Sequence, residues 1–294
     1  MSGVASGTLR LAAPSKVNLY LHVTGRRADG YHLLDSLVVF TALSDELELS
    51  LADGMSLSVR GAFAENTGPP EDNLVLRAAR ALAGAAKVDM GMAAVLTKNI
   101  PAAAGLGGGS ADAAAALRGL MRLWDIPPDA VDLPAIALEL GADMPVCLAA
   151  RPSFVGGVGE KIEAAPALPA AGLLLVNPGV ALATPSVFTG RRGGFLPPGR
   201  FDESPASAVA LAAMLREREN DLTGAAISLA PVISNVLDAL ESVPGCHLAR
   251  MTGSGATCFG LFDDESAAAS AAGEIMRDGW WVEATRILQP GQNS

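Results

Sequence analysis

The feature that most constrains the fold is a run of small residues between two regular segments. Residues 101–124 read PAAAGLGGGSADAAAALRGLMRLW, and the stretch MAAVLTKNI (92–100) before them has the composition of a strand. After the glycines, apolar residues recur at helical spacing: Ala113, Leu117, Leu120, Met121 and Trp124. We therefore expect a strand, a tight glycine loop and a helix in immediate succession.

This order is typical of a phosphate-binding site. Glycines allow main-chain N–H groups to converge on an anion without an intervening side chain. The following helix directs its positive dipole end and its unpaired N–H groups toward the same place. Ser110 is predicted to cap this helix and to offer a hydroxyl to a phosphate or to its Mg²⁺ ion. The alternative is a helix-entry loop that binds nothing, which the density of glycines disfavours.

Two common phosphate-binding motifs do not fit the loop. A Walker A motif, G-x-x-x-x-G-K-[ST], counted from Gly105 places Ser110 where a glycine is required, and no lysine follows. The dinucleotide motif G-x-G-x-x-G matches Gly105 and Gly107 but also meets Ser110 at its last glycine. The loop therefore belongs to another class of nucleotide-binding motif.

Composition excludes several classes of protein. The chain has 294 residues and a formal net charge of −10, which argues against a nucleic-acid partner. Its apolar runs are shorter than a membrane span and contain prolines, and its N-terminus lacks the features of a signal peptide. The three cysteines and three histidines show no metal-ligand spacing. We predict a soluble, cytoplasmic protein that binds neither nucleic acid nor membranes.

The patterns along the chain predict an α+β fold of two domains. The first third reads as strands, and a helix is expected to begin after Asp72 or Asn73. A short helix is expected within 133–145, and a loop over 184–205. Beyond it we expect helices at 208–217, 222–229, 232–240 and 265–276, and strands at 248–252, 257–262 and 280–288. We place an N-terminal nucleotide-binding domain at 1–158 and a C-terminal substrate-binding domain at 159–294.

The motif that does fit the glycine loop is P-x-x-x-G-L-G-x-G-S-A, from Pro101 to Ala111. Here the sequence resembles the GHMP kinase superfamily, as do APSKVNLYLHVTGRRADGYHLLDSL (13–37) and MTGSGATCFGLF (251–262). The resemblance covers roughly residues 10 to 265. It implies a two-domain GHMP kinase fold with the active site in the inter-domain cleft, and transfer of the γ-phosphoryl group of ATP, with Mg²⁺, to an alcohol.

Further motifs resemble one branch of that superfamily. RADGYH, together with GADMPVCL and the following GVGEKI, is similar to kinases of non-mevalonate isoprenoid synthesis that phosphorylate the 2-hydroxyl of a cytidine diphosphate-linked methylerythritol. The resemblance thus implies a small-molecule substrate that carries a base.

Lys16 and Asp143 are the candidate catalytic residues. Lysine is rare in this chain, so Lys16 in an apolar strand segment suggests a point charge chosen for its chemistry, although a lysine at a strand edge can simply reach solvent. Asp143 alone is more often a turn or cap residue than a catalytic one. The resemblance implies that Asp143 accepts the hydroxyl proton and that Lys16 steadies the attacking oxygen.

The binding residues also follow from the resemblance. Nucleotide contacts are expected from Asn73, Lys98, Pro101, Ala102, Ala103, Ala104, Gly105, Leu106, Gly107, Gly108, Gly109, Ser110 and Ala111. Substrate contacts are expected from Asn18, Tyr31, His32, Thr184 and Phe188. Tyr31 and Phe188 would stack on the two faces of a cytosine, and His32 would bind its edge. Residues 31–32 alone could be ordinary turn residues.

Two loop features carry further expectations. Alanines at 102–104 replace the Met-Gly-Gly type of many superfamily members, and we expect them to disfavour positive φ. The GSGA turn at 253–256 is expected to bring N–H groups to the cleft, or else to be a plain hairpin turn.

Two other functions stay open at this point. Another small-molecule kinase of the superfamily, of homoserine or mevalonate type, is disfavoured by DGYH and Phe188, because those substrates carry no base. A non-catalytic nucleotide-binding protein is disfavoured by the presence of both Lys16 and Asp143.

Overall fold

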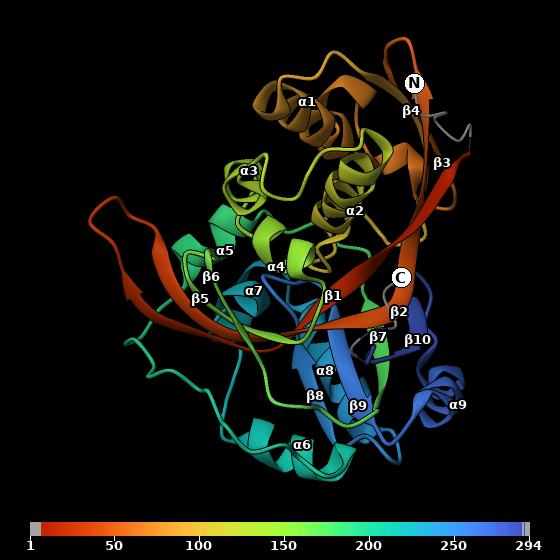
Figure 1. Cartoon of the computed structure of the whole chain (residues 1–294). Helices are drawn as coiled ribbons and strands as arrows, with labels where there is room; N and C mark the ends of the chain where they lie inside the picture. Colours follow the sequence, from red (N-terminus) through yellow and green to blue (C-terminus); the bar gives the residue numbers. More distant parts are fainter. Residues whose placement is uncertain (1–6, 290, 292–294) are drawn as a thin grey trace.

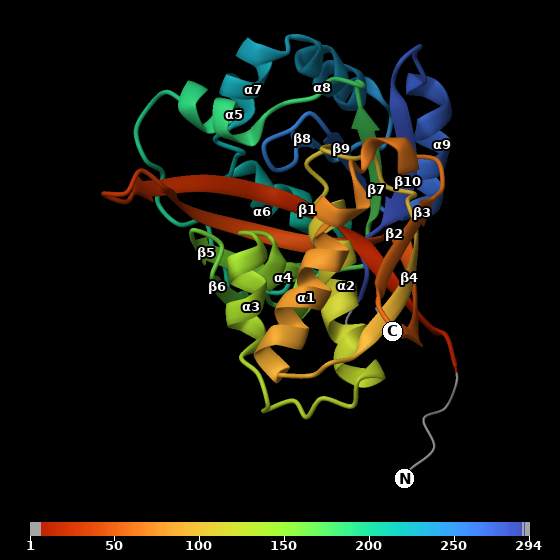
Figure 2. The same cartoon turned by 90° about the horizontal axis from the view of Figure 1, so that it is seen from above.

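A long antiparallel ribbon forms the centre of the molecule. The computed structural model describes residues 7–289 and 291. Strands β1 (Leu9–Arg26) and β2 (His32–Ala52) pair along almost their whole length, with register shifts near residues 15, 19 and 24. Figure 2 shows this ribbon crossing the molecule between two groups of helices. Because the ribbon contributes to both halves, residues on it lie close to the space between them.

The first sheet extends from one edge of β2. Its strand order is β3 (Met55–Arg60), β4 (Gly91–Thr97), β2, β5 (Ser153–Gly157) and β6 (Lys161–Ala164), with β1 on the other edge of β2. Only β3 and β4 run parallel; the other pairs are antiparallel. This half provides the strand and loop that precede the glycine-rich helix.

Four α-helices pack on the first sheet: α1 (Leu74–Ala86), α2 (Gly108–Leu123), α3 (Leu133–Leu140) and α4 (Met144–Ala149). Short 3-10 helices, Ala64–Asn66 and Pro70–Asp72, precede α1. Asn73 caps α1 by accepting a hydrogen bond from the Val75 N–H (2.9 Å), as one of the two predicted caps. The predicted apolar stripe of α2 is confirmed, since Ala113, Leu117 and Leu120 are fully buried.

The second sheet is antiparallel, with the order β10 (Trp281–Arg286), β7 (Gly172–Asn177), β9 (Cys258–Phe262) and β8 (Leu248–Met251). Its helices are α6 (Ala208–Arg216), α7 (Thr223–Leu229), α8 (Val232–Ser242) and α9 (Glu265–Ile275). Side chains on both faces of this sheet are buried. On one face they pack in a core with α7, α8 and α9, and on the other face in a second core with ribbon residues such as Val17 and Leu19. Figure 1 shows the two halves meeting at the ribbon.

Most elements predicted from the sequence are confirmed, helix α4 and strands β5, β6 and β7 were not predicted, and one predicted loop is wrong. Residues 184–190, expected as loop, form helix α5 (Thr184–Gly190), with a proline in its first turn and Val187 fully buried. Proline is well suited to the first turn of a helix, because the N–H that it lacks has no partner there. Within the described residues, no helix combines the length and hydropathy needed to cross a membrane.

The domain boundary at 158/159 falls between β5 and β6. These two strands form a hairpin of the first sheet, from Ser153 to Ala164. The chain enters the second sheet at Gly172. The division predicted from the sequence stays a prediction, and we propose a boundary between Ala164 and Gly172 because no sheet is divided there.

Candidate active site

A cavity of about 1190 Å³ lies where the two halves meet. It is lined by parts of the ribbon, the glycine loop, the start of α4, helix α5 and the turn at 253–255. The predicted site residues that line it are Lys16, Asn18, Tyr31, His32, Asn73, Lys98, Pro101, Ala102, Ala103, Ala104, Gly105, Gly107, Gly108, Gly109, Ser110, Asp143, Thr184 and Phe188. Leu106 and Ala111 do not line the cavity. Leu106 is buried in the core between the two halves, and Ala111 is buried in the core of the first half. Their side chains are therefore structural.

The glycine loop lies directly against the ribbon. The Lys16 N–H donates to the Leu106 carbonyl oxygen at 2.9 Å. Gly107 has φ +65°, and a Cβ added there would lie 2.7 Å from Cγ of Lys16. A Cβ on Gly105 (φ +79°) would lie 2.8 Å from the Gly255 carbonyl oxygen. Glycine is therefore required at both positions by the conformation and by the close approach of two other segments.

The start of α2 differs from the prediction. The helix begins at Gly108 and its N-cap is the left-handed Gly107, with no side-chain cap. Ser110 therefore lies within the first turn and does not cap the helix, because Gly107 already turns the chain into helical geometry. Ser110 lines the cavity, together with Gly108 and Gly109. The first turn of α2 thus faces the space where an anion would bind.

Ala103 contradicts the expectation for the three alanines. It adopts φ +53°, in the left-handed region that alanine disfavours. The left-handed region is sterically allowed to L-residues at a modest cost. Ala102 and Ala103 are exposed and Ala104 is buried, and all three line the cavity.

Gly107→Val is expected to weaken ATP binding and to leave the affinity for the second substrate less affected. A β-branched side chain at positive φ costs about 1–3 kcal/mol, and here it also meets the Lys16 side chain. The expected rise in Kd for ATP is roughly 5–150-fold. Titration calorimetry with each ligand checks this, with Gly84→Val as control, because a Cβ on Gly84 has no neighbour within 4 Å. Equal losses for both ligands with a lowered melting temperature would instead show that the loop is structural.

Lys16 and Asp143 lie side by side in the cavity. Lys16 Nζ is 3.4 Å from Asp143 Oδ2 and donates to Asn18 Oδ1 at 2.7 Å. The Lys16 side chain is 5% exposed and that of Asp143 is 49% exposed, so the lysine is fixed within the protein and the carboxylate faces the cavity. Asp143 precedes α4, yet its side chain makes no cap hydrogen bond. The carboxylate is therefore free to contact a ligand.

Asn18 is held by two residues that sequence reasoning missed. Its Nδ2 donates to Ser36 Oγ, and its main-chain N–H donates to Thr252 Oγ1, both at 2.8 Å. Ser36 in turn donates to the Tyr20 carbonyl oxygen. Thr252 directly precedes the GSGA turn, so this hydrogen bond connects the turn to the ribbon next to Lys16. Both residues stand inside motif stretches quoted from the sequence, which is the one signal that pointed to them.

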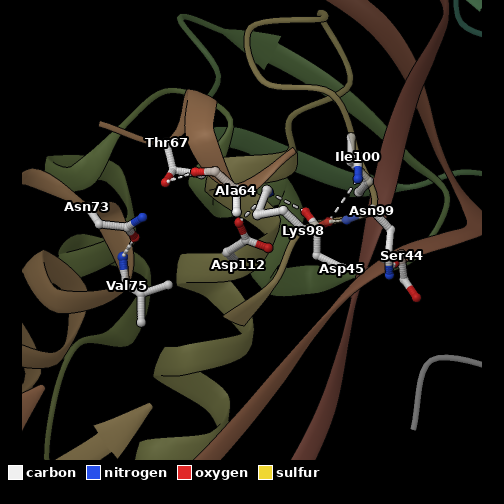
Figure 3. Close-up of polar contacts among 10 residues, drawn as sticks. All are labelled: Ser44, Asp45, Ala64, Thr67, Asn73, Val75, Lys98, Asn99, Ile100 and Asp112. Atoms are coloured by element: carbon white, nitrogen blue, oxygen red, sulfur yellow. Dashed lines mark hydrogen bonds and ion pairs between the residues drawn. The ribbon is translucent and has the colours of Figure 1, made fainter. Parts of the chain in front are cut away.

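Lys98 lies in a buried cluster at the base of the glycine loop, shown in Figure 3. Its ammonium donates to Asp45 Oδ2 and, at 2.7 Å, to Asp112 Oδ2. The other oxygen of Asp45 accepts from the N–H groups of Asn99 (2.6 Å) and Ile100 (2.9 Å). The cluster therefore fixes both ends of the loop, the strand before it and the first turns of α2 after it.

The charges of this cluster influence one another strongly. Burial alone lowers the pKa of Lys98, but the carboxylates of Asp112 and Asp45 outweigh it and raise that pKa. Burial raises the pKa of Asp112. The Lys98 ammonium lowers this pKa, and the neighbouring Asp45 carboxylate raises it, so the net shift is upward. Sequence reasoning found Lys98 and missed both carboxylates. The predicted role of Lys98 toward a nucleotide stays a prediction.

Four of the predicted substrate residues, Tyr31, His32, Thr184 and Phe188, line another part of the cavity. The rings of His32 and Phe188 stack, with centroids 5.1 Å apart and planes 25° apart. Tyr31 is 66% exposed beside them. Thr184 and Ser254 share a hydrogen bond between their hydroxyls at 2.8 Å, which links α5 to the GSGA turn. Burial lowers the pKa of His32, and Arg26 and Arg191 lower it further, so the neutral imidazole is favoured.

Two family models match this chain. The model of the GHMP kinase N-terminal domain matches residues 73–151, and that of the GHMP kinase C-terminal domain matches residues 206–280. The first includes the glycine loop and Asp143. The second includes the GSGA turn and β9, so the two models correspond to the two halves of the structure.

Relatives of known identity are similar over nearly the whole chain. The 4-diphosphocytidyl-2-C-methyl-D-erythritol kinase of Paramagnetospirillum magneticum is 52% identical over 95% of this chain and 98% of its own. A crystal structure of a 4-(cytidine 5'-diphospho)-2C-methyl-D-erythritol kinase superposes with TM-score 0.76 at 34% identity, over 95% of this chain and all of that one. The homoserine kinase of Cytophaga hutchinsonii has TM-score 0.69 at 16% identity, over 98% of this chain and 96% of that one, and shares the fold.

Proposed function

This chain belongs to the GHMP kinase family, and we propose that it transfers the γ-phosphoryl group of ATP to the 2-hydroxyl of 4-diphosphocytidyl-2-C-methyl-D-erythritol. The observation that carries the proposal is one cavity that holds three features together. They are the glycine loop at a helix start, the Lys16–Asp143 pair beside it, and the stacked His32 and Phe188 rings beyond the pair. The relatives with about half of their residues identical carry the name of this activity.

The catalytic pair supplies the proton transfer. The Asp143 carboxylate accepts the proton of the 2-hydroxyl as its oxygen attacks the γ-phosphorus. The bond between that phosphorus and the β–γ bridging oxygen breaks, and ADP leaves. Lys16, held by Asn18, places its ammonium next to the attacking oxygen and the developing charge. Little covalent chemistry is asked of the protein beyond this positioning.

The glycine loop fits the phosphates of ATP. Close contacts at Gly105 and Gly107 leave no room for side chains there. Gly108, Gly109 and Ser110 line the cavity at the start of α2, where unpaired main-chain N–H groups of a helix bind anions. Within the described residues, no three His, Cys, Asp or Glu side chains gather as a metal cage. Ser110 lines the cavity in the first turn of α2, and its hydroxyl would bind a Mg²⁺ ion that neutralises phosphate charge. The free thiols of Cys147, Cys246 and Cys258 are consistent with a cytoplasmic enzyme.

The base pocket distinguishes this function from those of other GHMP kinases. Homoserine and mevalonate carry no base, so the aromatic and imidazole rings at Tyr31, His32 and Phe188 have no counterpart in such a substrate. The likeness to homoserine kinase shows the fold alone. A non-catalytic nucleotide-binding role gives no reason for a buried lysine beside an aspartate whose side chain does not cap its helix.

Tyr31→Ala and Phe188→Ala are each expected to weaken binding of the cytidyl substrate without changing ATP affinity. Removal of a stacking face costs about 1–3 kcal/mol, or roughly 5–150-fold in Kd. Tyr31→Phe keeps the ring and is the matched control, with a smaller effect. The double alanine variant is expected to lose less than the sum of the two, because one open face already lets the base tilt. Normal binding by both single variants would show that the pocket does not read a base.

A further inference from the structure

Five cationic side chains line the cavity: Lys16, Arg26, Lys98, Arg191 and Arg192. Three of them are paired with carboxylates, Lys16 with Asp143, Lys98 with Asp45 and Asp112, and Arg191 with Asp221. Across residues 7–289, Arg26 and Arg192 form no such pair. In a chain with net charge −10, two guanidinium groups that face a cavity without a counter-charge point to an anionic ligand.

Main-chain oxygens anchor both guanidinium groups. Arg26 Nε donates to the Gly30 carbonyl oxygen at 3.0 Å, within the turn that joins β1 to β2. Arg192 Nη1 donates to the carbonyl oxygens of Thr189 (3.0 Å) and Arg191 (3.1 Å), just after α5. Each guanidinium has five N–H donors, so most of them stay free for a ligand. The anchoring also reduces the side-chain freedom that binding would otherwise remove.

Both arginines lie at the base end of the cavity. Arg26 pairs with His32 across the ribbon, and the charge of Arg26 acts on that imidazole. Arg192 follows Phe188 by four residues, and Phe188 stacks on His32. One arginine therefore comes from the ribbon, next to His32, and the other from the segment just after the helix that carries Phe188, and both line the cavity.

We propose that Arg26 and Arg192 bind the diphosphate that connects the cytidine to the sugar alcohol. This inference rests on the proposed function, which has the base at Tyr31, His32 and Phe188 and the reacting hydroxyl at Lys16 and Asp143. The diphosphate connects these two parts of the substrate, so it must lie between them. Guanidinium groups bind phosphate oxygens through paired N–H donors, and a diphosphate diester carries two negative charges at neutral pH.

The test compares cytidine with CDP, which share the base and differ in the phosphates. The dissociation constant of each is measured by calorimetry for the wild-type protein, Arg26→Ala and Arg192→Ala. The matched control is Arg27→Ala, since Arg27 is next to Arg26, is ion-paired with Asp29 at 2.7 Å and does not line the cavity. We expect CDP to bind more tightly than cytidine to the wild type. Each test variant is expected to weaken CDP binding by about 3- to 20-fold, less than a buried charge-assisted bond because both sites are exposed.

The expected pattern has three parts. Cytidine binding stays within about twofold in every variant, the CDP preference falls in Arg26→Ala and Arg192→Ala, and Arg27→Ala keeps the wild-type preference. Arg26→Gln retains a donor for the Gly30 oxygen and is expected to lose the preference as well, which separates the charge from the shape of the turn. An unchanged preference in Arg26→Ala and Arg192→Ala overturns this inference, as does an equal loss for both ligands. A wild-type protein that binds neither ligand overturns the proposed function together with it.

Discussion

Replacing Asp143 with asparagine is expected to lower kcat by about 10²–10⁴-fold while leaving the affinities for ATP and the cytidyl substrate nearly unchanged. The amide keeps the shape of the carboxylate but cannot accept the proton of the attacking hydroxyl. The Asp143 side chain does not cap α4, so the substitution removes no helix-stabilising hydrogen bond. It removes the negative charge beside Lys16, whose hydrogen bond to Asn18 remains, so the melting temperature is expected to fall only slightly. Single-turnover kinetics at saturating substrates measures the effect on the chemical step directly.

Asp132→Asn is the matched control for this variant. Asp132 caps α3 by accepting from the Ala135 N–H at 3.0 Å, and asparagine is an equally good N-cap residue. Full activity is expected in the control. A loss of less than about tenfold in Asp143→Asn would remove Asp143 from the role of general base.

The second large effect is expected for Lys16→Met, which should lower kcat by about 10²–10³-fold. This is the range observed when an enzyme loses one donor to the charge that develops in the transition state. Methionine retains the length and the apolar stem of the lysine, so packing against Gly107 is largely preserved. Binding of ATP and substrate is expected to change much less than kcat. Lys161→Met is the control, because Lys161 is exposed on β6.

Lys16→Arg is expected not to restore activity. The Lys16 stem lies so close to Gly107 that a Cβ there would be 2.7 Å away, and the Lys16 side chain is 5% exposed. A planar guanidinium has a different shape and cannot take the position of a compact ammonium between Asn18 and Asp143. Wild-type kcat in the arginine variant would show that any cation suffices at this position.

The sequence predicted those parts of the site that depend on neighbouring residues. The glycine loop, the Asn73 cap and the apolar stripe of α2 are local patterns, and each is confirmed. The exact start of α2 was wrong, because a left-handed Gly107 substitutes for a side-chain cap and no propensity scale distinguishes the two. Similarly, Ala103 takes a backbone conformation that local preference argues against.

Contacts between distant residues were beyond local patterns. Lys98 was identified, but its partner Asp45 is 53 residues away. Its other partner, Asp112, faces Lys98 because of the position at which α2 begins, which the sequence did not predict correctly. Asn18 and Thr252 are 234 residues apart, and their hydrogen bond exists because the second sheet packs on the ribbon. Lys16 and Asp143 were placed together by family resemblance, since spacing alone cannot bring residues from different elements to 3.4 Å.

The most direct test of the account is ATP consumption by the purified protein with three candidate acceptors under identical conditions. The acceptors are 4-diphosphocytidyl-2-C-methyl-D-erythritol, homoserine and mevalonate. The cavity with its stacked rings predicts turnover with the cytidyl compound and none above background with the other two. Turnover with homoserine or mevalonate and none with the cytidyl compound would contradict the account.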